Sequence, residues 1–439
     1  MALNPFQIVK FRCGGIDVHK YLLVVTVSQT DPKTLKTEYH TMRCSGYNND
    51  LDAMCQWIID HDVYDIAMES TGKYWVPVAN KLEEHGIKYK LVHPKYVKAI
   101  AGQKGDKTDS KFICCMHACD LSGPGSVILS KDFRDLRDLA RRYWKLGNEI
   151  TSEKNRYQNC MTVCNIGIDS VFADPFCKSA RAVMKEVLRS DEIDDKKILS
   201  LVSKRAKNKE HILDAIHGSK ITPDQRFKMA DITLHLEELE KHRDSIFCEM
   251  VAMLEPYADT LYNLTSIPGI GVSSALMILA EIGNDMSFWR DGRQLSAWAG
   301  LTPNNDQSHG KKKSTRISKA GKYLKPLLLQ CAFAAVKNPN EYFGIKYRRI
   351  CRRRGKKKAM IAIMRMMLVA IYEVIKDNKV FKPTDYEEVT NPAPKKTKEL
   401  TADQAISVLK NLGYDVTQLK IPETEQSIQS SKSAVSTAA

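Results

Sequence analysis

Four carboxylates in the first quarter of the chain have the residue types and the surroundings of a divalent-metal site. Asp106 and Asp109 stand three positions apart in GDKTDSK, residues 105–111. Asp17 stands in the apolar segment GIDVHK, and Glu69 stands near the end of YDIAMES. An ionised carboxylate among apolar neighbours is costly unless a cation pairs with it. Hard cations prefer such oxygen ligands, and two of them about 3.5 to 4 Å apart promote phosphodiester displacement.

A purely structural explanation of the same acids is also open. Asp106 and Asp109 suit the first turn of a helix over 107–120, where negative charge complements the helix dipole. Asp17 could instead bind a neighbouring basic side chain. Spacing alone does not decide between a metal site and these structural roles.

Basic residues are concentrated in one window of the sequence. The 439-residue chain has 67 Lys and Arg against 52 Asp and Glu, a net charge of +15. Residues 301–360 contain 17 basic residues and only Asp306 and Glu341 as acids. The net charge of this window, 17 − 2 = +15, therefore equals the net charge of the whole chain. Such a concentration favours a polyanionic partner. The densest run, YRRICRRRGKKK at 347–358, predicts a helix whose basic side binds phosphates, with a solvated surface as the alternative.

The elements that must position the four acids follow from hydrophobic periodicity. The predicted order is a strand over 14–27, a strand over 36–44, a helix over 49–60, a strand over 63–70, a helix over 76–84, a strand over 87–94 and the helix over 107–120. A β-rich start that passes into α/β alternation predicts one mixed sheet flanked by helices.

Two long helices are predicted after this sheet. Apolar residues recur every seven positions over 131–165 and again from 232 to 253: Leu136, Tyr143, Ile150, Tyr157 and Cys164, then Ile232, Leu239, Ile246 and Met253. Sustained heptads with charged residues between them predict a coiled coil, formed either between the two helices or across a dimer. Two ordinary core helices of one subunit are the alternative.

The segment after Pro256 predicts a helix, a Pro-Gly-Ile-Gly turn and a second helix, LTSIPGIGVSSALMILAEIG. Helix-hairpin-helix units have such turns, in which glycines, here Gly269 and Gly271, expose backbone N–H groups to a phosphate. A plain corner between two helices is the alternative. Residues 391–439 predict a linker, one short helix near 401–411 and a disordered end.

The twelve cysteines are scattered, with no secretory signal and no apolar stretch of about 20 residues, which indicates a reduced cytosol and no membrane partner. Cys114, Cys115 and Cys119 form a cluster that includes His117. Zinc ligands usually come as two separated pairs, so these cysteines are interpreted as apolar positions on a helix, with a metal–thiolate site as the alternative.

An ordered set of segments also carries a resemblance to a known family: GIDVHK, AMESTGKYWVPVANKLEEHG, LVHPKYVKAIAGQKGDKTDSKFI, SIPGIG, LAEIG and QLSAWAGLTPNNDQSHGKKKSTRISKAGKYLKPLLLQCA. Together they resemble the DEDD insertion-sequence transposases, a family of bridge-RNA-guided recombinases. The resemblance implies a RuvC-like amino-terminal domain of RNase H-like fold whose four acids bind Mg²⁺. Matched motif by motif, these acids are Asp17, Glu69, Asp106 and Asp109.

The resemblance further implies a serine nucleophile that becomes covalently joined to DNA. Its motif is Gly-Leu-x-Pro followed shortly by Ser-Gly, and GLTPNNDQSHGKK places Ser308 in that role, in a loop. The match departs from the motif because His309 separates Ser308 from Gly310. Ser296 and Ser314 are the other candidates. A serine hydroxyl needs a base, a metal or nearby positive charge to react, and lysines follow at once.

The expected organisation is an α/β, RNase H-like (RuvC-like) catalytic domain over 1–130, a coiled-coil dimerisation region over 131–256, a mostly α-helical transposase domain with a helix-hairpin-helix-like turn over 257–385, and a linker and tail over 386–439. The expected nucleic-acid contacts are Gly269, Gly271, Lys311, Lys312, Lys313, Arg316, Lys319, Lys322, Arg348, Arg349, Arg352, Arg353, Arg354, Lys356, Lys357 and Lys358.

The expected activity is RNA-guided cleavage and exchange of DNA strands in the cytoplasm, at the nucleoid. The expected partners are donor and target DNA, a structured non-coding guide RNA, and further copies of the chain that form a dimer and then a tetramer on nucleic acid. A metal-dependent junction nuclease without serine chemistry and a nucleic-acid-binding scaffold remain alternatives. A sugar-kinase-like ATPase lacks support, because no Gly-rich phosphate loop follows the first strand.

Overall fold

The computed structural model describes most of the chain between residues 7 and 391. The described residues are 7–70, 72–93, 106–123, 125–189, 192–203, 206, 208–303, 306–308, 311–314 and 316–391, with the backbone alone for 70, 106–108, 306–308 and 311–313. His309, Gly310 and the short helix predicted near 401–411 lie outside the described residues.

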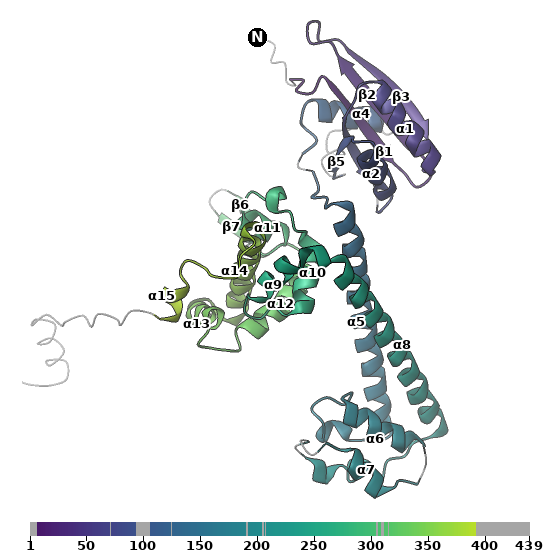
Figure 1. Cartoon of the computed structure of the whole chain (residues 1–439), viewed down its shortest axis with the longest axis vertical. Coiled ribbons are helices and arrows are strands. Elements are labelled where there is room, and N and C mark those ends of the chain that lie inside the picture. Colours follow the sequence, from purple (N-terminus) through teal and green to yellow (C-terminus); the bar gives the residue numbers. More distant parts are fainter. Residues whose placement is uncertain are drawn as a thin grey trace, which may run out of the picture.

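A five-stranded mixed sheet forms the amino-terminal region (Figure 1), with the strand order β3-β2-β1-β4-β5. Strands β1 (Arg12–Val18), β2 (Leu23–Thr30) and β3 (Thr37–Cys44) form an antiparallel meander. Strands β4 (Asp65–Ser70) and β5 (Lys88–Val92) continue the sheet on the other side of β1 with parallel pairing.

The single strand predicted over 14–27 is wrong, because this segment folds back on itself as the hairpin of β1 and β2. Three consecutive exposed residues, His19, Lys20 and Tyr21, interrupt the buried run, and the His19 N–H donates to the Leu22 carbonyl to close the turn. Apolar residues flank this turn on both sides, so the composition concealed it.

Helices cover both faces of the sheet. Helices α1 (Asn48–Asp60) and α2 (Trp75–Glu84) cover one face, where Ile16, Val18 and Met68 join their core. Helix α4 (Asp106–Ala118) covers the other face and contacts β1, β2 and β4. The predicted mixed sheet flanked by helices is therefore confirmed.

Two long helices leave the sheet region and lie side by side (Figure 1): α5 (Lys131–Val163) and α8 (Pro223–Met253). Their far end carries α6 (Lys178–Arg189) and α7 (Asp195–Leu201), with the short 3-10 helices η1 (Ile168–Ser170) and η2 (Lys209–His211). Heptad residues Ile150 and Tyr157 of α5 share a buried core with Ile232 and Leu239 of α8. The two helices thus bury their apolar stripes within one chain.

The carboxyl-terminal region is mostly helical and packs around the buried side of α14. Its elements are η3 (Glu255–Tyr257), α9 (Ala258–Thr265), α10 (Val272–Ile282), η4 (Met286–Phe288), α11 (Gly292–Trp298), β6 (Asp306–Ser308), β7 (Lys311–Ser314), α12 (Leu324–Ala335), α13 (Tyr342–Arg354), α14 (Lys356–Asp377) and α15 (Tyr386–Thr390). The single helix predicted through 347–358 is wrong, because Gly355, with a φ of 80°, separates α13 from α14.

The twelve cysteines all lie among the described residues and are all free thiols. In the cluster on α4, Cys114 is buried and packs with Cys13 of β1, while Cys115 and Cys119 are half-buried. In the described part of the chain, no helix is long and apolar enough to cross a membrane.

Candidate active site

Strands β1 and β4 place Asp17 and Glu69 directly beside each other, as register partners in a parallel pair. Neighbouring strands lie about 4.8 Å apart, and alternate residues of a strand share one face. Gly15 of β1 contacts α4, and Ala67 of β4 packs with Ile113 of α4. Two positions further along their strands, Asp17 and Glu69 therefore stand on this same face.

Helix α4 runs antiparallel to β1, so its first turn approaches Asp17. Cys13 packs with Cys114 and Ala118, and Gly15 lies against the backbone of Ser110 and Cys114. Each two-residue step along β1 is about 6.6 Å and each four-residue step back along α4 is about 6 Å, so the contacts stay in phase. The next step pairs Asp17 with the turn that begins at Asp106.

Gly15 permits this close packing. A Cβ atom at Gly15 would lie 2.4 Å from the Ser110 carbonyl oxygen and 2.4 Å from the Cys114 nitrogen. The Ser110 hydroxyl also lies 2.8 Å from the Thr26 hydroxyl of β2, and both side chains are fully buried. These contacts therefore fix the distance between α4 and the sheet at Gly15, which stands two residues before Asp17.

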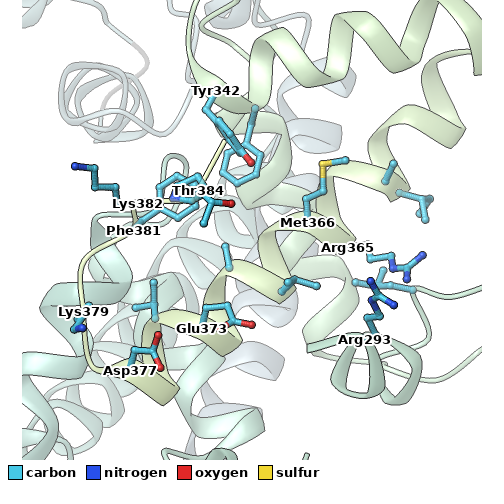
Figure 2. Close-up of a pocket in the computed structure, with 18 of the residues that line it drawn as sticks. Arg293, Tyr342, Arg365, Met366, Glu373, Asp377, Lys379, Phe381, Lys382 and Thr384 are labelled. Atoms are coloured by element: carbon cyan, nitrogen blue, oxygen red, sulfur yellow. The ribbon is translucent and has the colours of Figure 1, made fainter. Parts of the chain in front are cut away.

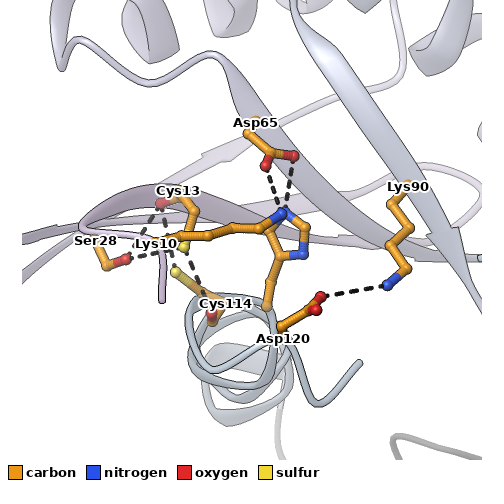
Figure 3. Close-up of polar contacts among 8 residues, drawn as sticks. Lys10, Cys13, Ser28, Asp65, Lys90, Cys114 and Asp120 are labelled. Carbon is orange, nitrogen blue, oxygen red and sulfur yellow. Dashed lines mark hydrogen bonds and ion pairs between the residues drawn. The ribbon is translucent and has the colours of Figure 1, made fainter. Parts of the chain in front are cut away.

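The far end of α4 is held by a partly buried polar cluster (Figure 3). The His117 Nε2 atom lies 2.9 Å from Asp65 Oδ1, and Lys10 Nζ donates to Asp65 Oδ2 at 2.5 Å. Burial would raise the pKa of Asp65, but the hydrogen bonds from His117 and Lys10 outweigh it and lower the pKa to about 2. His117 thus anchors α4 to the start of β4.

Asp17 is 8% exposed and interacts with His19, whose Nε2 atom lies 3.0 Å from Asp17 Oδ2. His19 is exposed at the β1–β2 turn, so it reaches the site from the solvent side. Sequence reasoning did not single out His19. The signal was present in GIDVHK, because His19 stands two positions after Asp17.

The structure brings Asp17, Glu69 and the start of α4 together. Asp109 is half-buried on α4, whereas only the backbone of Asp106 is described. Among the side chains that the structure describes, no three His, Cys, Asp or Glu residues group closely enough to hold a metal ion. The approach of all four carboxylates to one point therefore remains a prediction.

Ser308 ends β6 and pairs with Lys311 of β7, so it stands in a small hairpin rather than in the expected loop. Of the other candidates, Ser296 is fully buried in α11 and donates to the Gly292 carbonyl at 2.8 Å. Ser314 is half-buried in β7. Figure 1 shows the β6–β7 hairpin on the helical region, away from α4 and the sheet. One chain therefore does not bring Ser308 to the acids.

The Pro-Gly-Ile-Gly turn packs against α12. Gly269 has a φ of 87°, and a Cβ atom there would lie 2.3 Å from the Cys331 carbonyl oxygen. The close packing against α12 and the positive φ are therefore sufficient to explain a glycine at position 269. Gly271 is the N-cap residue of α10, and a Cβ atom there would meet nothing within 4 Å, so this helix start is open to a ligand.

Most of the predicted phosphate-binding side chains are exposed on two surfaces. Lysine and arginine side chains crowd the junction of α13 and α14 and the segment that follows β7. The exposed ones are Arg316, Lys319, Lys322, Arg348, Arg349, Arg352, Arg353, Arg354, Lys356, Lys357 and Lys358, while Lys311, Lys312 and Lys313 are described by backbone alone. Their exposure leaves them available to a polyanion.

Two family models match this chain. A DEDD transposase model matches residues 14–166, which contain all four acids, and the model of the transposase IS116/IS110/IS902 family matches residues 261–348, which contain Ser308. The first match thus covers the sheet and α4, and the second covers the β6–β7 hairpin.

Named relatives agree with these models. A probable family 20 transposase of Pseudomonas aeruginosa is 38% identical over 282 residues, 62% of this chain and 71% of the relative. The transposase for insertion sequence element IS1111A of Coxiella burnetii is 32% identical over 27% of this chain and only 34% of its own length. The pilin gene-inverting protein of Moraxella bovis is 23% identical over 78% of this chain and 92% of its own length. The chain belongs to the DEDD insertion-sequence transposases of the IS116/IS110/IS902 family.

Proposed function

We propose that this chain cleaves and joins DNA strands during the movement of an insertion sequence, with Asp17, Glu69, Asp106 and Asp109 as Mg²⁺ ligands and Ser308 as the nucleophile. The names of its relatives, two transposases and one gene-inverting protein, support a DNA substrate. The register pairing of Asp17 with Glu69, on the face where α4 begins, is the observation that carries the metal site.

The donor set suits a hard divalent cation. Asp17 and Glu69 supply carboxylate oxygens from two adjacent strands, and Asp106 and Asp109 would supply them from the first turn of α4. These residues would hold Mg²⁺, which would supply stabilisation of negative charge on the attacking and leaving oxygens. His19 would hold the Asp17 carboxylate in one orientation through their 3.0 Å contact.

Ser308 would attack the scissile phosphorus through its hydroxyl oxygen. A serine–phosphorus bond forms, the bond to the leaving deoxyribose oxygen breaks, and the serine proton is passed on so that the leaving oxygen is protonated. The lysines of β7 would stabilise the developing phosphate charge. Because the hairpin lies away from α4 in one chain, a second subunit would supply the serine to each acidic site.

The finer expectations belong to the same proposal. The sheet region would be a RuvC-like domain of RNase H-like fold over 1–130. Residues 131–256 would pair subunits through the outer surface of the α5–α8 coiled coil, because the apolar stripes of these helices are buried against each other within one chain. Residues 257–385 would form the transposase domain, with a phosphate bound at Gly271. A structured guide RNA would select the DNA sequences by base pairing, while the basic surfaces bind phosphates.

Trapping a covalent intermediate tests this proposal. The full chain is incubated with Mg²⁺, DNA carrying the element end, and RNA transcribed from the sequence that flanks the gene, and then resolved under denaturing conditions. We expect a protein–DNA adduct from the wild type and from Ser314→Ala, and none from Ser308→Ala, which should still bind the DNA.

The alternatives give different outcomes in the same assay. Cleavage of DNA by Ser308→Ala without a protein–DNA adduct would exclude Ser308 as the nucleophile and favour a metal-dependent nuclease that uses water. Cleavage that is equally absent from the wild type and from Asp106→Asn would favour a nucleic-acid-binding scaffold. Adduct formation without any RNA would remove the guide from the proposal while leaving the serine in place.

A further inference from the structure

A groove of about 890 Å³ runs along one side of α14 (Figure 2). Its lining is mainly apolar and includes Leu301, Phe343, Ile361, Met366, Val369 and Phe381. The groove begins beside Leu301 and Pro303, which lead toward β6, and extends to residues 379–384 after α14. It lies outside the candidate active site on the sheet.

The floor of the groove is a helical stripe that no described segment covers fully. Half-buried residues recur along α14 at 361, 362, 365, 366, 369 and 370, all lining the groove. The opposite side of α14, with Ile363, Met367 and Ile371, is fully buried in the core. An elongated apolar stripe of this kind suits the apolar face of another helix.

Charged side chains lie at two places along the groove. Arg293 and Arg365 lie near each other beside the middle of the stripe (Figure 2), while Glu373 and Asp377 follow it toward the end of α14. Lys379 and Lys382 also line the acidic end. A helix that fits this groove has an apolar face, an acidic residue beside Arg293 and Arg365, and polar residues beside the end that Glu373 and Asp377 line.

We propose that residues 402–412 of this same chain bind in the groove as an amphipathic helix. Their sequence, ADQAISVLKNL, places five apolar residues at helical spacing, and Thr401 and Gln404 form a capping-box pattern ahead of them. The apolar face consists of Ala402, Ala405, Ile406, Leu409 and Leu412. These residues lie outside the part of the chain that the structure describes.

The connection to the groove has sufficient length. The described chain stops at Asn391, just after α15, whose Tyr386 stacks on Tyr342 at 5.7 Å between ring centroids and packs near Phe381. Both partners of Tyr386 line the groove. The ten residues 392–401 can span about 33 Å, whereas α14 rises about 24 Å between 361 and 377.

Charge selects the direction in which the segment binds. Asp403 stands in the first turn of the proposed helix, and Lys410 stands near its end. Asp403 would lie beside Arg293 and Arg365, so the bound helix runs parallel to α14. The docked segment would then lie beside the stretch from Leu301 to Pro303 that leads to Ser308. Docking itself does not depend on the proposed serine chemistry.

Photo-crosslinking in the full chain tests the docking. The photoreactive residue p-benzoylphenylalanine replaces Val369 or, in a second protein, Met366, and the crosslinked peptides are identified by mass spectrometry. We expect crosslinks to residues 402–412 from both positions, and none from Lys376, which is exposed on α14 outside the groove. A mixture of isotopically light and heavy chains should give crosslinks within one chain only.

A matched pair of variants gives the control. Ile406→Asp with Leu409→Asp should reduce the crosslink at least tenfold, whereas Asn411→Asp, on the opposite side of the predicted helix, should leave it intact. A folded protein whose crosslinks join two different chains, join added nucleic acid, or miss residues 402–412 from both positions would overturn the proposal.

Discussion

Asp17 and Glu69 are register partners on β1 and β4 and stand on the face that α4 covers. Neutralising either carboxylate without changing its size should remove a metal ligand. We therefore expect Asp17→Asn and Glu69→Gln to lower the rate of DNA cleavage about a hundredfold or more, because metal catalysis supplies several kcal/mol. Cleavage kinetics at saturating Mg²⁺ measure the effect.

Asp60→Asn is the matched control, because Asp60 is an exposed acid at the end of α1. It should cleave at the wild-type rate. Thermal unfolding of all three variants should stay near that of the wild type, since a loss of fold would imitate a loss of ligand. Wild-type cleavage by Asp17→Asn in a folded protein would rule out the metal site.

Gly15→Ala should destabilise the sheet region, because the new Cβ atom would lie 2.4 Å from two backbone atoms of α4. Overpacking of this kind costs about 1 to 3 kcal/mol and would displace the first turn of α4 from Asp17. Urea unfolding measures the cost. Gly147→Ala in α5, where a Cβ atom meets nothing within 4 Å, should instead leave stability unchanged or raise it by up to about 1 kcal/mol. Equal stability of the two variants would contradict the close packing.

Glu281→Ala should weaken the attachment of α5 to α10. The Glu281 carboxylate is buried and accepts two hydrogen bonds from Arg141, at 2.8 and 3.0 Å, and Arg137 donates to the Glu281 carbonyl. Burial lowers the pKa of Arg137 to about 10, although Glu281 opposes this. Removing the acid leaves two arginines without their counter-charge, so we expect a loss of about 2 to 4 kcal/mol in unfolding free energy, with partial exposure of Arg141 limiting it.

Glu149→Ala provides the exposed counterpart on α5, the helix of Arg141, because Glu149 pairs with Arg142 at 3.5 Å with both side chains about half exposed. Such a pair contributes little, so the change should be under about 1 kcal/mol. A larger loss from Glu149→Ala than from Glu281→Ala would mean that the buried pair does not hold α5 to α10.

Local periodicity was enough to predict α1, α2 and α5 within about two residues, because each helix has one apolar stripe over several turns. It found the end of α8 but not its beginning, because the heptad run starts at Ile232, nine residues after Pro223. It was also enough to place Asp17 and Glu69 on strands. The parallel pairing of these strands is a long-range contact, and only the fold shows that the two residues share a register.

The errors have a common physical origin. The turn at 19–21 and the break at Gly355 each lie inside a longer run, apolar in one case and basic in the other. The interruptions are short, three residues and one glycine, so the surrounding pattern outweighed them. The fit of α4 against Gly15 depends on a helix about 95 positions later in the chain. Sequence patterns predicted the elements that carry the candidate residues better than they predicted the contacts that hold these elements in place.

The pH dependence of stability should report the cluster that anchors α4. The pKa of Asp65 is lowered to about 2 in the folded chain from an ordinary 3.8, so its ionised form stabilises the fold above about pH 4. This contribution is lost as the pH falls toward 2. Asp65→Asn should therefore be less stable by about 1 kcal/mol at pH 7, after allowance for the partly exposed carboxylate, and the difference should narrow below pH 4.

Urea unfolding at several pH values measures this difference, with Asp60→Asn as the control acid on α1. The control should differ little from the wild type at any pH. A gap between Asp65→Asn and the wild type that widens below pH 4 would contradict the stabilising role assigned to the ionised carboxylate.

The basic junction of α13 and α14 should govern the salt dependence of nucleic-acid binding. Arg352, Arg353 and Arg354 are exposed at the end of α13. Each phosphate contact that is removed lowers the slope of log affinity against log salt by about 0.9 on duplex DNA. Replacing all three arginines by alanine should therefore reduce the slope by up to about 2.7, and should weaken binding to matched and mismatched DNA equally.

Lys220, Lys228 and Lys241, three exposed lysines on and just before α8, give a control with the same change in net charge. Their replacement by alanine should leave the slope nearly unchanged, because α8 lies away from the α13–α14 junction in Figure 1. Fluorescence anisotropy over a salt series measures both slopes. If the two triple variants lose the same slope, general attraction by net charge explains binding, and the junction is not a phosphate-binding surface.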